Sequence, residues 1–227
     1  MSTGERPDTE VPAELRTLAN DPLHGDDRLR EYFGDSYPRV LAFAELLADQ
    51  GVLRGLIGPR ELTRIWERHI LNSAAVVPFL GEGTIVDVGS GAGLPGIVVA
   101  AMLPERQVVL VEPMERRTTW LFEAAERCGI DNAIVVRGRA EEVRESVEAD
   151  VITARAVASI DKIVKWCAPL LSPTGTMALL KGRSAPLEIE SAKYVLRRAG
   201  LVGEVHDAHT LDGVDPTTVV TLTRAAH

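Results

Sequence analysis

The chain has 227 residues, of which 45% are hydrophobic and 26% are charged, and its formal net charge is −8 at pH 7. A chain of this size and composition can bury a substantial core as one globular domain, without disulfides or metals to hold it together. No apolar run reaches the roughly 18 residues that a membrane span requires, and the opening stretch MSTGERPDTE lacks the apolar segment of a signal peptide. We therefore expect a cytoplasmic protein that does not enter a membrane.

The cysteines indicate the redox compartment of the protein, and the charge distribution bears on its possible partners. Cys128 and Cys167 form no CxxC pair, which argues against a disulfide framework and suits a reducing compartment. Residues 1–50 carry 11 acidic and 5 basic side chains, whereas residues 112–200 carry 13 acidic and 14 basic ones. A locally basic surface is therefore compatible with the acidic net charge, which does not exclude a polyanionic partner.

The N-terminal part of the chain is predicted to be an extension followed by helices. Residues 1–24 combine prolines and acidic side chains with little hydrophobic periodicity, so we expect a disordered acidic extension. Residues 25–81 are predicted to form a helical cap. Apolar residues recur at helical spacing from 26 to 50, where Gly34 and Pro38 divide two helices. Another helix is expected to begin at Pro59 and to end near Pro78.

The stretch from Thr84 to Gly96, TIVDVGSGAGLPG, predicts a strand, a glycine-rich turn and a helix. The β-branched run before Gly89 is typical of a strand buried on both faces. Glycines follow at positions 89, 91, 93 and 96, and Pro95 is expected to occupy the first position of the helix. Such an arrangement brings a ligand against bare backbone at a helix N-terminus.

Strands and helices alternate after this turn. The last two expected strands have no helix between them, so one of them should run antiparallel to an otherwise parallel sheet. The pattern predicts an α/β core over 82–227 that forms one folded domain with the cap. Strands are expected at 107–111, 133–136, 150–153, 176–180, 201–209 and 217–223, and helices at 114–128, 159–168 and 186–198.

The glycine turn fits more than one cofactor. Gly91–Gly96 satisfies the GxGxxG pattern, and Glu112 stands about twenty residues on, where a ribose hydroxyl would be held. A nicotinamide, S-adenosylmethionine or no ligand at all would fit these residues. Asp87, placed near a cationic methionine group, and Ala140-Glu141, placed near an adenine, favour S-adenosylmethionine.

Together these residues resemble the RsmG (GidB) family of bacterial small-subunit ribosomal RNA methyltransferases. The resemblance implies a Rossmann-like class I S-adenosylmethionine-dependent methyltransferase fold, a seven-stranded mostly parallel sheet with the N-terminal helical cap over the cofactor site. It also implies methylation of ring nitrogen 7 of a guanine in 16S rRNA near the decoding centre. The segments that carry it are WERHILNS (66–73), VDVGSGAGLPGI (86–97), GRAEE (138–142), ARAVAS (154–159) and LKG (180–182).

The predicted cofactor contacts come from two sources. The resemblance implies contacts from Gly89, Leu94, Ala140, Glu141 and Arg155. Glu112 occupies the ribose position on both grounds, and the residues of the turn add Asp87, Gly91 and Gly93.

The implied reaction makes modest demands on side chains. Guanine nitrogen 7 carries no proton, so in-line methyl transfer needs no general base and depends on positioning. A base inside a stacked loop would be extruded to be reached. Arg155 and Lys181 are the candidate orienting groups. Arg155 could instead be a surface arginine paired with a neighbouring acid, and Lys181 could be a solvated strand end. The candidate RNA contacts are Arg116, Arg117, Arg137, Arg139, Lys181 and Arg183.

The histidines are not expected to bind cofactor or metal, and the sequence differs from the family pattern at two places. His69 is predicted to cap the core rather than to line the cofactor pocket, and His206 and His209 lack companions for a metal site, so no metal is expected. Asn72 stands where the family has an aspartate, and the stretch 213–216 lacks a basic residue that family members often carry there.

The expected partner is 16S rRNA, in the small subunit or its precursor, and the protein is expected to be a monomer. Three rivals stay open. The first is a small-molecule methyltransferase on the same fold, the second a nicotinamide-dependent oxidoreductase, and the third a cofactor-sensing RNA-binding module without turnover.

Overall fold

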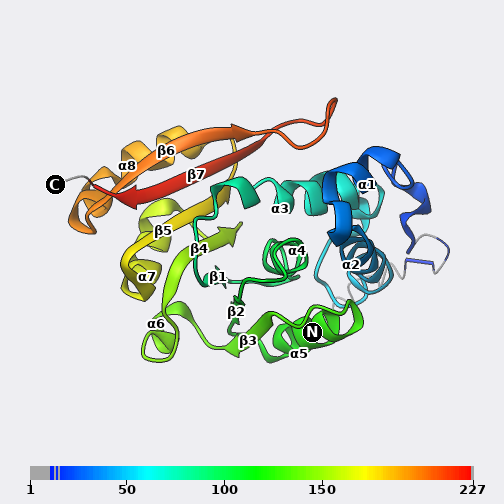
Figure 1. Ribbon diagram of the computed structural model, residues 1–227, viewed down its shortest axis with the longest axis horizontal. Helices are drawn as coiled ribbons and strands as arrows, with labels where there is room; N and C mark the ends of the chain where they lie inside the picture. Colours follow the sequence, from blue (N-terminus) through cyan, green and yellow to red (C-terminus); the bar gives the residue numbers. More distant parts are fainter. Residues whose placement is uncertain (1–10, 13, 15, 226–227) are drawn as a thin grey trace, which may run out of the picture.

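One seven-stranded sheet forms the centre of the molecule (Figure 1). The structure is a computed structural model that describes residues 11–12, 14 and 16–225. The strand order is β3-β2-β1-β4-β5-β7-β6, and only β7 runs against the others. The expected α/β sheet with one antiparallel strand is confirmed. The strands are β1 (Ile85–Val88), β2 (Val108–Glu112), β3 (Ala133–Arg137), β4 (Ala149–Arg155), β5 (Leu171–Lys181), β6 (Leu201–Ala208) and β7 (Thr217–Arg224).

Helices cover both faces of the sheet and bury two separate cores. On β1, Ile85 belongs to the core shared with the cap, whereas Val86 belongs to the opposite core. This alternation follows from the two-residue period of a strand, and it explains why β1 is apolar on both faces. Helices α4 (Gly96–Met102) and α5 (Glu115–Arg127) lie on the cap side, and α6 (Ala140–Val143), α7 (Ile160–Cys167) and α8 (Ala185–Arg198) lie on the other.

The helical cap begins with two helices as expected, α1 (Asp27–Phe33) and α2 (Tyr37–Gln50). The third expected helix is not continuous. It is a 3-10 helix η4 (Pro59–Arg64), a π-helix η5 (Trp66–Leu71) and a short α3 (Asn72–Ala74), and a 3-10 turn η6 (Val77–Phe79) follows. The Trp66 N–H donates to Asp21 Oδ2 at 2.9 Å, at the residue where the π-helical winding begins.

The stretch just before the cap differs from the predicted disordered extension. Residues Leu18–Asn20 form a 3-10 turn, η2, and Leu18 is buried in the cap-side core. Asp21 is also buried, and its carboxylate accepts from both Trp66 N and Leu23 N. One apolar side chain and one doubly bonded carboxylate therefore anchor residues 16–24, and the prediction of disorder is wrong there. Of the earlier residues, 1–10, 13 and 15 lie outside the described part of the chain.

The cap packs on the helices that cover one face of the sheet. Helices α2 and α3 pack on α4, and α2 also contacts α5 (Figure 1). Leu56 and the segment 68–72 of the cap reach the edge at which the parallel strands end, where ligands bind in such sheets. Among the described residues, no helix is both long and apolar enough to cross a membrane.

Candidate functional site

The glycine turn between β1 and α4 adopts backbone conformations that favour glycine. Gly89, Gly91 and Gly93 have φ angles of +72°, +54° and +92°, a region that glycine enters without steric cost. A Cβ on Gly89 would lie 2.8 Å from Val157 Cγ2, so that position also needs the missing side chain. The turn therefore keeps its backbone close to the segment that follows β4.

Asp87 precedes this turn and lines neither of the two cavities that adjoin it. Its carboxylate is fully buried, and Oδ2 accepts from Gly96 N at 3.0 Å. A Cβ on Gly96 would lie 2.5 Å from the same oxygen, so strand and helix are in close contact. Burial raises the pKa of Asp87 to about 7. The structure therefore gives Asp87 an internal role, joining β1 to α4, in place of the predicted cofactor contact. Pro95 precedes the helix instead of opening it.

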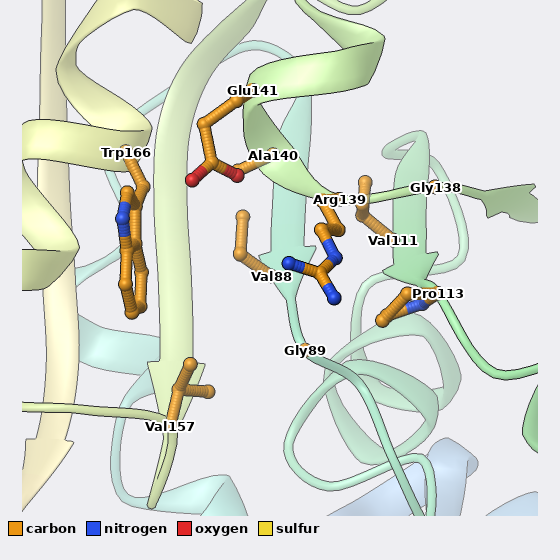
Figure 2. A pocket seen from close by; sticks show the side chains of 10 residues that line it. All are labelled: Val88, Gly89, Val111, Pro113, Gly138, Arg139, Ala140, Glu141, Val157 and Trp166. Atoms are coloured by element: carbon orange, nitrogen blue, oxygen red, sulfur yellow. The ribbon is translucent and has the colours of Figure 1, made fainter.

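An apolar cavity of about 180 Å³ lies beside Gly89 (Figure 2). Val88 and Val111 line it from the ends of β1 and β2, and Trp166 lines it from α7. Figure 2 shows Trp166 and Arg139 on opposite sides, with Glu141 reaching in from α6. The cavity brings together three of the predicted cofactor contacts, Gly89, Ala140 and Glu141. Trp166 was missed, because nothing in the sequence of α7 marks one tryptophan as facing this edge.

A polar cavity of about 390 Å³ adjoins the apolar one and shares Gly89, Pro113 and Val157 with it. The predicted Gly91, Leu94, Glu112 and Arg155 line it, and so does Leu56 from the cap, which the sequence did not single out. The predicted Gly93 lines neither cavity; a Cβ there would meet Ile97 and Phe43.

Glu112 is buried and already bonded to backbone. Oε2 accepts from Gly91 N at 3.0 Å and Oε1 from Met114 N at 2.9 Å. Arg117 lies 3.9 Å from Oε2. Each carboxylate oxygen can accept more than one hydrogen bond, so Glu112 shapes the turn and still offers acceptors to the polar cavity.

Arg155, at the end of β4, is held only by uncharged acceptors among the described residues. Its NH1 group donates to Arg68 O at 2.9 Å and to Asn72 Oδ1 at 3.1 Å, and its NH2 group lies 3.1 Å from His69 Nδ1. Burial lowers the pKa of Arg155 to about 10, so it is still a cation at neutral pH. A desolvated cation with neutral partners favours an anion in the adjoining cavity.

The residue after Arg155 has an unusual backbone. Ala156 has a φ angle of +55° and is the only non-glycine residue with positive φ in the described part of the chain. Such conformations cost energy and gather at functional sites. Ala156 lines the polar cavity and also a further groove, which we name the cap groove. The cap groove has a volume of about 590 Å³ and lies between η4, η5, the end of β4 and the turn before β7.

His69 is buried, as predicted, and it also lines the cap groove. Burial, with the charges of Arg155 and Arg68, lowers its pKa to about 3, so the ring is neutral at pH 7. A guanidinium only donates, so Nδ1 accepts from Arg155 and the ring proton sits on Nε2. Nε2 is 3.0 Å from Glu61 Oε2, without the alignment of a hydrogen bond.

Lys181 reaches the neighbourhood of Arg155, but its ammonium group is already engaged. Nζ donates to Ala158 O at 2.8 Å and lies 2.7 Å from Glu188 Oε2. The side chain is 10% exposed. Together with Arg155 and Asn72 it lines a smaller cavity of about 260 Å³. The structure therefore brings the two candidate orienting groups to adjoining places, one of them neutralised by a partner.

The candidate RNA contacts do not share one environment. Arg116 and Arg183 are exposed, Arg137 is paired with Glu115 at 3.0 Å, and Arg139 lines the apolar cavity. No group of three or more potential metal ligands exists in the described part of the chain. His206 is accounted for by Thr221 Oγ1, 2.8 Å from its Nε2.

Comparisons with known proteins point to one family. A family model described as rRNA small subunit methyltransferase G matches residues 36–209. The Ribosomal RNA small subunit methyltransferase G of Thermobifida fusca is 48% identical over 197 residues, covering 86% of this chain and 82% of that protein.

Two solved structures show the same fold. Precorrin-6y C5,15-methyltransferase from Geobacter metallireducens has a TM-score of 0.52 at 14% identity, over 74% of this chain and 90% of that one. Aeropyrum pernix fibrillarin in complex with S-adenosyl-L-methionine has a TM-score of 0.50 at 18% identity, over 67% and 76%. The fold is thus the Rossmann-like methyltransferase fold, and the chain belongs to the rRNA small subunit methyltransferase G family.

Proposed function

We propose that this protein uses S-adenosylmethionine to methylate ring nitrogen 7 of a guanine in 16S rRNA, in the small ribosomal subunit or its precursor. The observation that carries the proposal is the pair of adjoining cavities around the glycine turn. One is apolar and the other is polar and ends at a partly buried cation, Arg155.

The residues present fit the three chemical parts of this cofactor. The aliphatic and indole walls formed by Val88, Val111 and Trp166 suit a planar adenine, with Glu141 beside it. Glu112 offers carboxylate oxygens to a ribose diol. Arg155 offers a guanidinium to the amino-acid carboxylate. When bound, the cofactor supplies an electrophilic methyl group.

The chain's own contribution is binding and orientation. Guanine nitrogen 7 has a free lone pair, so no side chain has to remove a proton. His69 fits this requirement, because its low pKa and its bond from Arg155 make it a fixed neutral group rather than a base. Correct placement of two reactants can contribute roughly 7–11 kcal/mol to lowering a barrier, so most of the catalysis would come from the walls of these cavities.

Methyl transfer to small ribosomal subunits tests the proposal. Subunits from a strain that lacks the modification are incubated with the protein and S-adenosylmethionine carrying a labelled methyl group. Borohydride and aniline then cleave the RNA at 7-methylguanine. We expect label in 16S rRNA and one new cleavage site. Label in no RNA, or at a base that is not cleaved, would overturn the proposal.

Binding measurements separate the rivals. Calorimetry with S-adenosylmethionine, S-adenosylhomocysteine and NADH should show binding of the first two. Tight binding of NADH alone would favour the oxidoreductase. Label in a small molecule but not in RNA would favour the small-molecule methyltransferase, and cofactor and RNA binding without transfer would favour the sensing module.

A further inference from the structure

The cap groove continues from the polar cavity on the side away from the glycine turn. Arg155 and Ala156 line both spaces, so a group in the cap groove lies next to whatever Arg155 binds. Residues of η4 and η5 form one wall of the groove, and Asp215 to Thr217 form the other. At about 590 Å³ it has room for a nucleobase with its sugar and phosphate.

One donor and one acceptor stand side by side in this groove without being bonded to each other. The Nε2 atom of His69 is buried and has no hydrogen-bond partner, although Glu61 Oε2 is only 3.0 Å away. The His69 side chain is 9% exposed. Glu61 receives only one long hydrogen bond among the described residues, 3.4 Å from Arg68 NH1. Buried polar groups normally find partners, so an unpaired donor beside an underused carboxylate indicates a missing ligand.

The order of these two groups matches one purine base. Guanine presents an acceptor, O6, directly beside a donor, the N1–H group, and the 2-amino group adds a second donor. The Nε2–H group of His69 can donate to O6 while the Glu61 carboxylate accepts from N1 and the 2-amino group. Adenine presents the reverse order, its 6-amino donor beside the N1 acceptor. It would place a donor against the Nε2–H group of His69 and an acceptor against the carboxylate of Glu61. Enzymes that extrude a base commonly read this Watson–Crick edge.

We propose that Glu61 and His69 are the pair that selects guanine in the cap groove. The inference rests on the proposed function, because it assumes that a guanine is extruded into this site. Arg155 links the two halves of the site: it donates to His69 Nδ1, which fixes the ring proton on Nε2, and it lines the polar cavity. Arg64 and Arg68, each about half exposed at the groove mouth, are placed for the phosphates on either side.

Glu67 provides a matched control in the same groove. It is also a glutamate of the cap, but both of its oxygens accept from Arg64, at 2.9 and 3.1 Å. Its carboxylate is therefore already used. Replacing either glutamate by glutamine removes one charge from the groove wall and keeps the side-chain shape, so the two variants differ in which carboxylate they remove.

The test compares Glu61→Gln with Glu67→Gln and the unchanged protein on two RNAs. After the methylated nucleotide has been mapped, subunits are reconstituted with guanine or with adenine at that position. The unchanged protein should prefer guanine by about 100-fold or more, because a site built to hydrogen-bond one edge rejects its reverse. A glutamine amide can both donate to and accept from the adenine edge. Glu61→Gln should therefore lower transfer to guanine at least about 10-fold and bring the preference below about 10-fold.

Each outcome decides the inference. Binding of S-adenosylmethionine, measured by calorimetry, should change less than about threefold in both variants, and Glu67→Gln should keep the guanine preference. If Glu61→Gln keeps the full preference, or loses cofactor affinity in parallel with transfer, Glu61 does not select the base. If the unchanged protein methylates no guanine, the proposed function fails and this inference fails with it. The inference is supported if the Glu61→Gln variant loses the preference for guanine and the Glu67→Gln variant keeps it.

Discussion

Arg155 owes its position to three acceptors that carry no negative charge. A backbone carbonyl, the amide of Asn72 and the imidazole of His69 orient the guanidinium without neutralising it. The Asn72 Nδ2 group in turn donates to Thr217 Oγ1 at 3.0 Å, so the amide bridges the end of β4 and the start of β7. A carboxylate at position 72 would neutralise Arg155 directly, whereas Asn72 leaves its charge available to an anionic group of a ligand.

Replacing Arg155 by alanine should lower methyl transfer at least about 100-fold, roughly 3 kcal/mol in transition-state stabilisation. The reason is the loss of a partly buried cation that lines both the polar cavity and the cap groove. Single-turnover transfer and calorimetry with S-adenosylmethionine measure the effect. Arg155→Lys keeps the charge but not the fork of donors, and should recover only part of the activity. Near-normal turnover in the alanine variant would show that the assignment is wrong.

Asp87 leads to a prediction about stability and pH. Burial raises its pKa to about 7 in the folded protein, from an ordinary value near 3.8. The folded state therefore holds this proton more tightly than the unfolded state, and stability declines as the pH rises from about 4 to about 7. An asparagine at this position can still accept from Gly96 N but has no charge to bury. Asp87→Asn should therefore gain stability relative to the unchanged protein at pH 8, and less at pH 5.

Urea unfolding at pH 5 and pH 8 checks this prediction. Cofactor binding should persist in the Asp87→Asn variant, because Asp87 lines neither the apolar nor the polar cavity. A variant that unfolds normally but no longer binds S-adenosylmethionine would restore Asp87 to the role that the sequence suggested.

At the scale of elements, the carboxylate of Glu188 joins β5, α7 and α8, and through Lys181 it also holds the segment that follows β4. Glu188 of α8 pairs with Lys181 at the end of β5 and accepts from Ile160 N at the start of α7. Its other oxygen accepts from Ser184 Oγ. Lys181 in turn holds Ala158 O, within the segment that joins β4 to α7. This segment includes Val157, which lines both the apolar and the polar cavity, so the ion pair supports the wall between them.

Glu188→Gln should loosen the segment between β4 and α7. The backbone N–H of Ile160 should exchange faster with solvent. The affinity for S-adenosylmethionine should fall roughly 3- to 10-fold, since one partly buried ion pair is worth on the order of 1 kcal/mol. Glu190→Gln is the control, because Glu190 lies on the same helix and its ion pair with Lys193 is exposed. Hydrogen exchange and calorimetry report the two effects. Equal behaviour of the two variants would remove this role from Glu188.

Elements with a strong local pattern were predictable from the sequence, and those made by distant contacts were not. The sheet, its antiparallel member and the glycine turn follow from periodicity and from positions that favour glycine. The hydrogen bond from Trp66 N, where the winding changes, goes to Asp21, which is far away in the sequence. The position of Asp87 at the end of the first strand likewise suggested that it faces a ligand. The direction of its side chain is decided instead by the contact of β1 with α4. For the same reason Leu56 and Trp166 had no local signal.

At the scale of the whole molecule, an acidic protein must approach an acidic polymer. The formal net charge is −8, yet exposed arginines lie near the site, including Arg64 and Arg68 at the mouth of the cap groove. Distant repulsion and local attraction are both screened by salt, but contacts to phosphates release counterions and dominate the response.

Transfer to ribosomal RNA should therefore fall steeply between about 50 and 200 mM salt, values at which protein–nucleic acid contacts weaken strongly. Binding of S-adenosylmethionine should change little over the same range, because a small ligand held in these cavities does not release the many counterions that a polymer of phosphates does. Initial rates at several salt concentrations, with calorimetry in parallel, test this. A flat response of the rate would favour a small-molecule substrate.

The place of β7 in the sheet has a consequence for biosynthesis. β7 follows β6 in the chain, yet it lies between β5 and β6 and bonds to both. It also supplies Thr217, which accepts a hydrogen bond from Asn72, and Asn72 in turn accepts one from Arg155. While a ribosome is still making this protein, β6 has no neighbour to join and the cap groove lacks one wall. A nascent chain that has not yet released β7 should therefore be inactive, and a stop codon just before residue 217 would remove an interior strand instead of trimming an end.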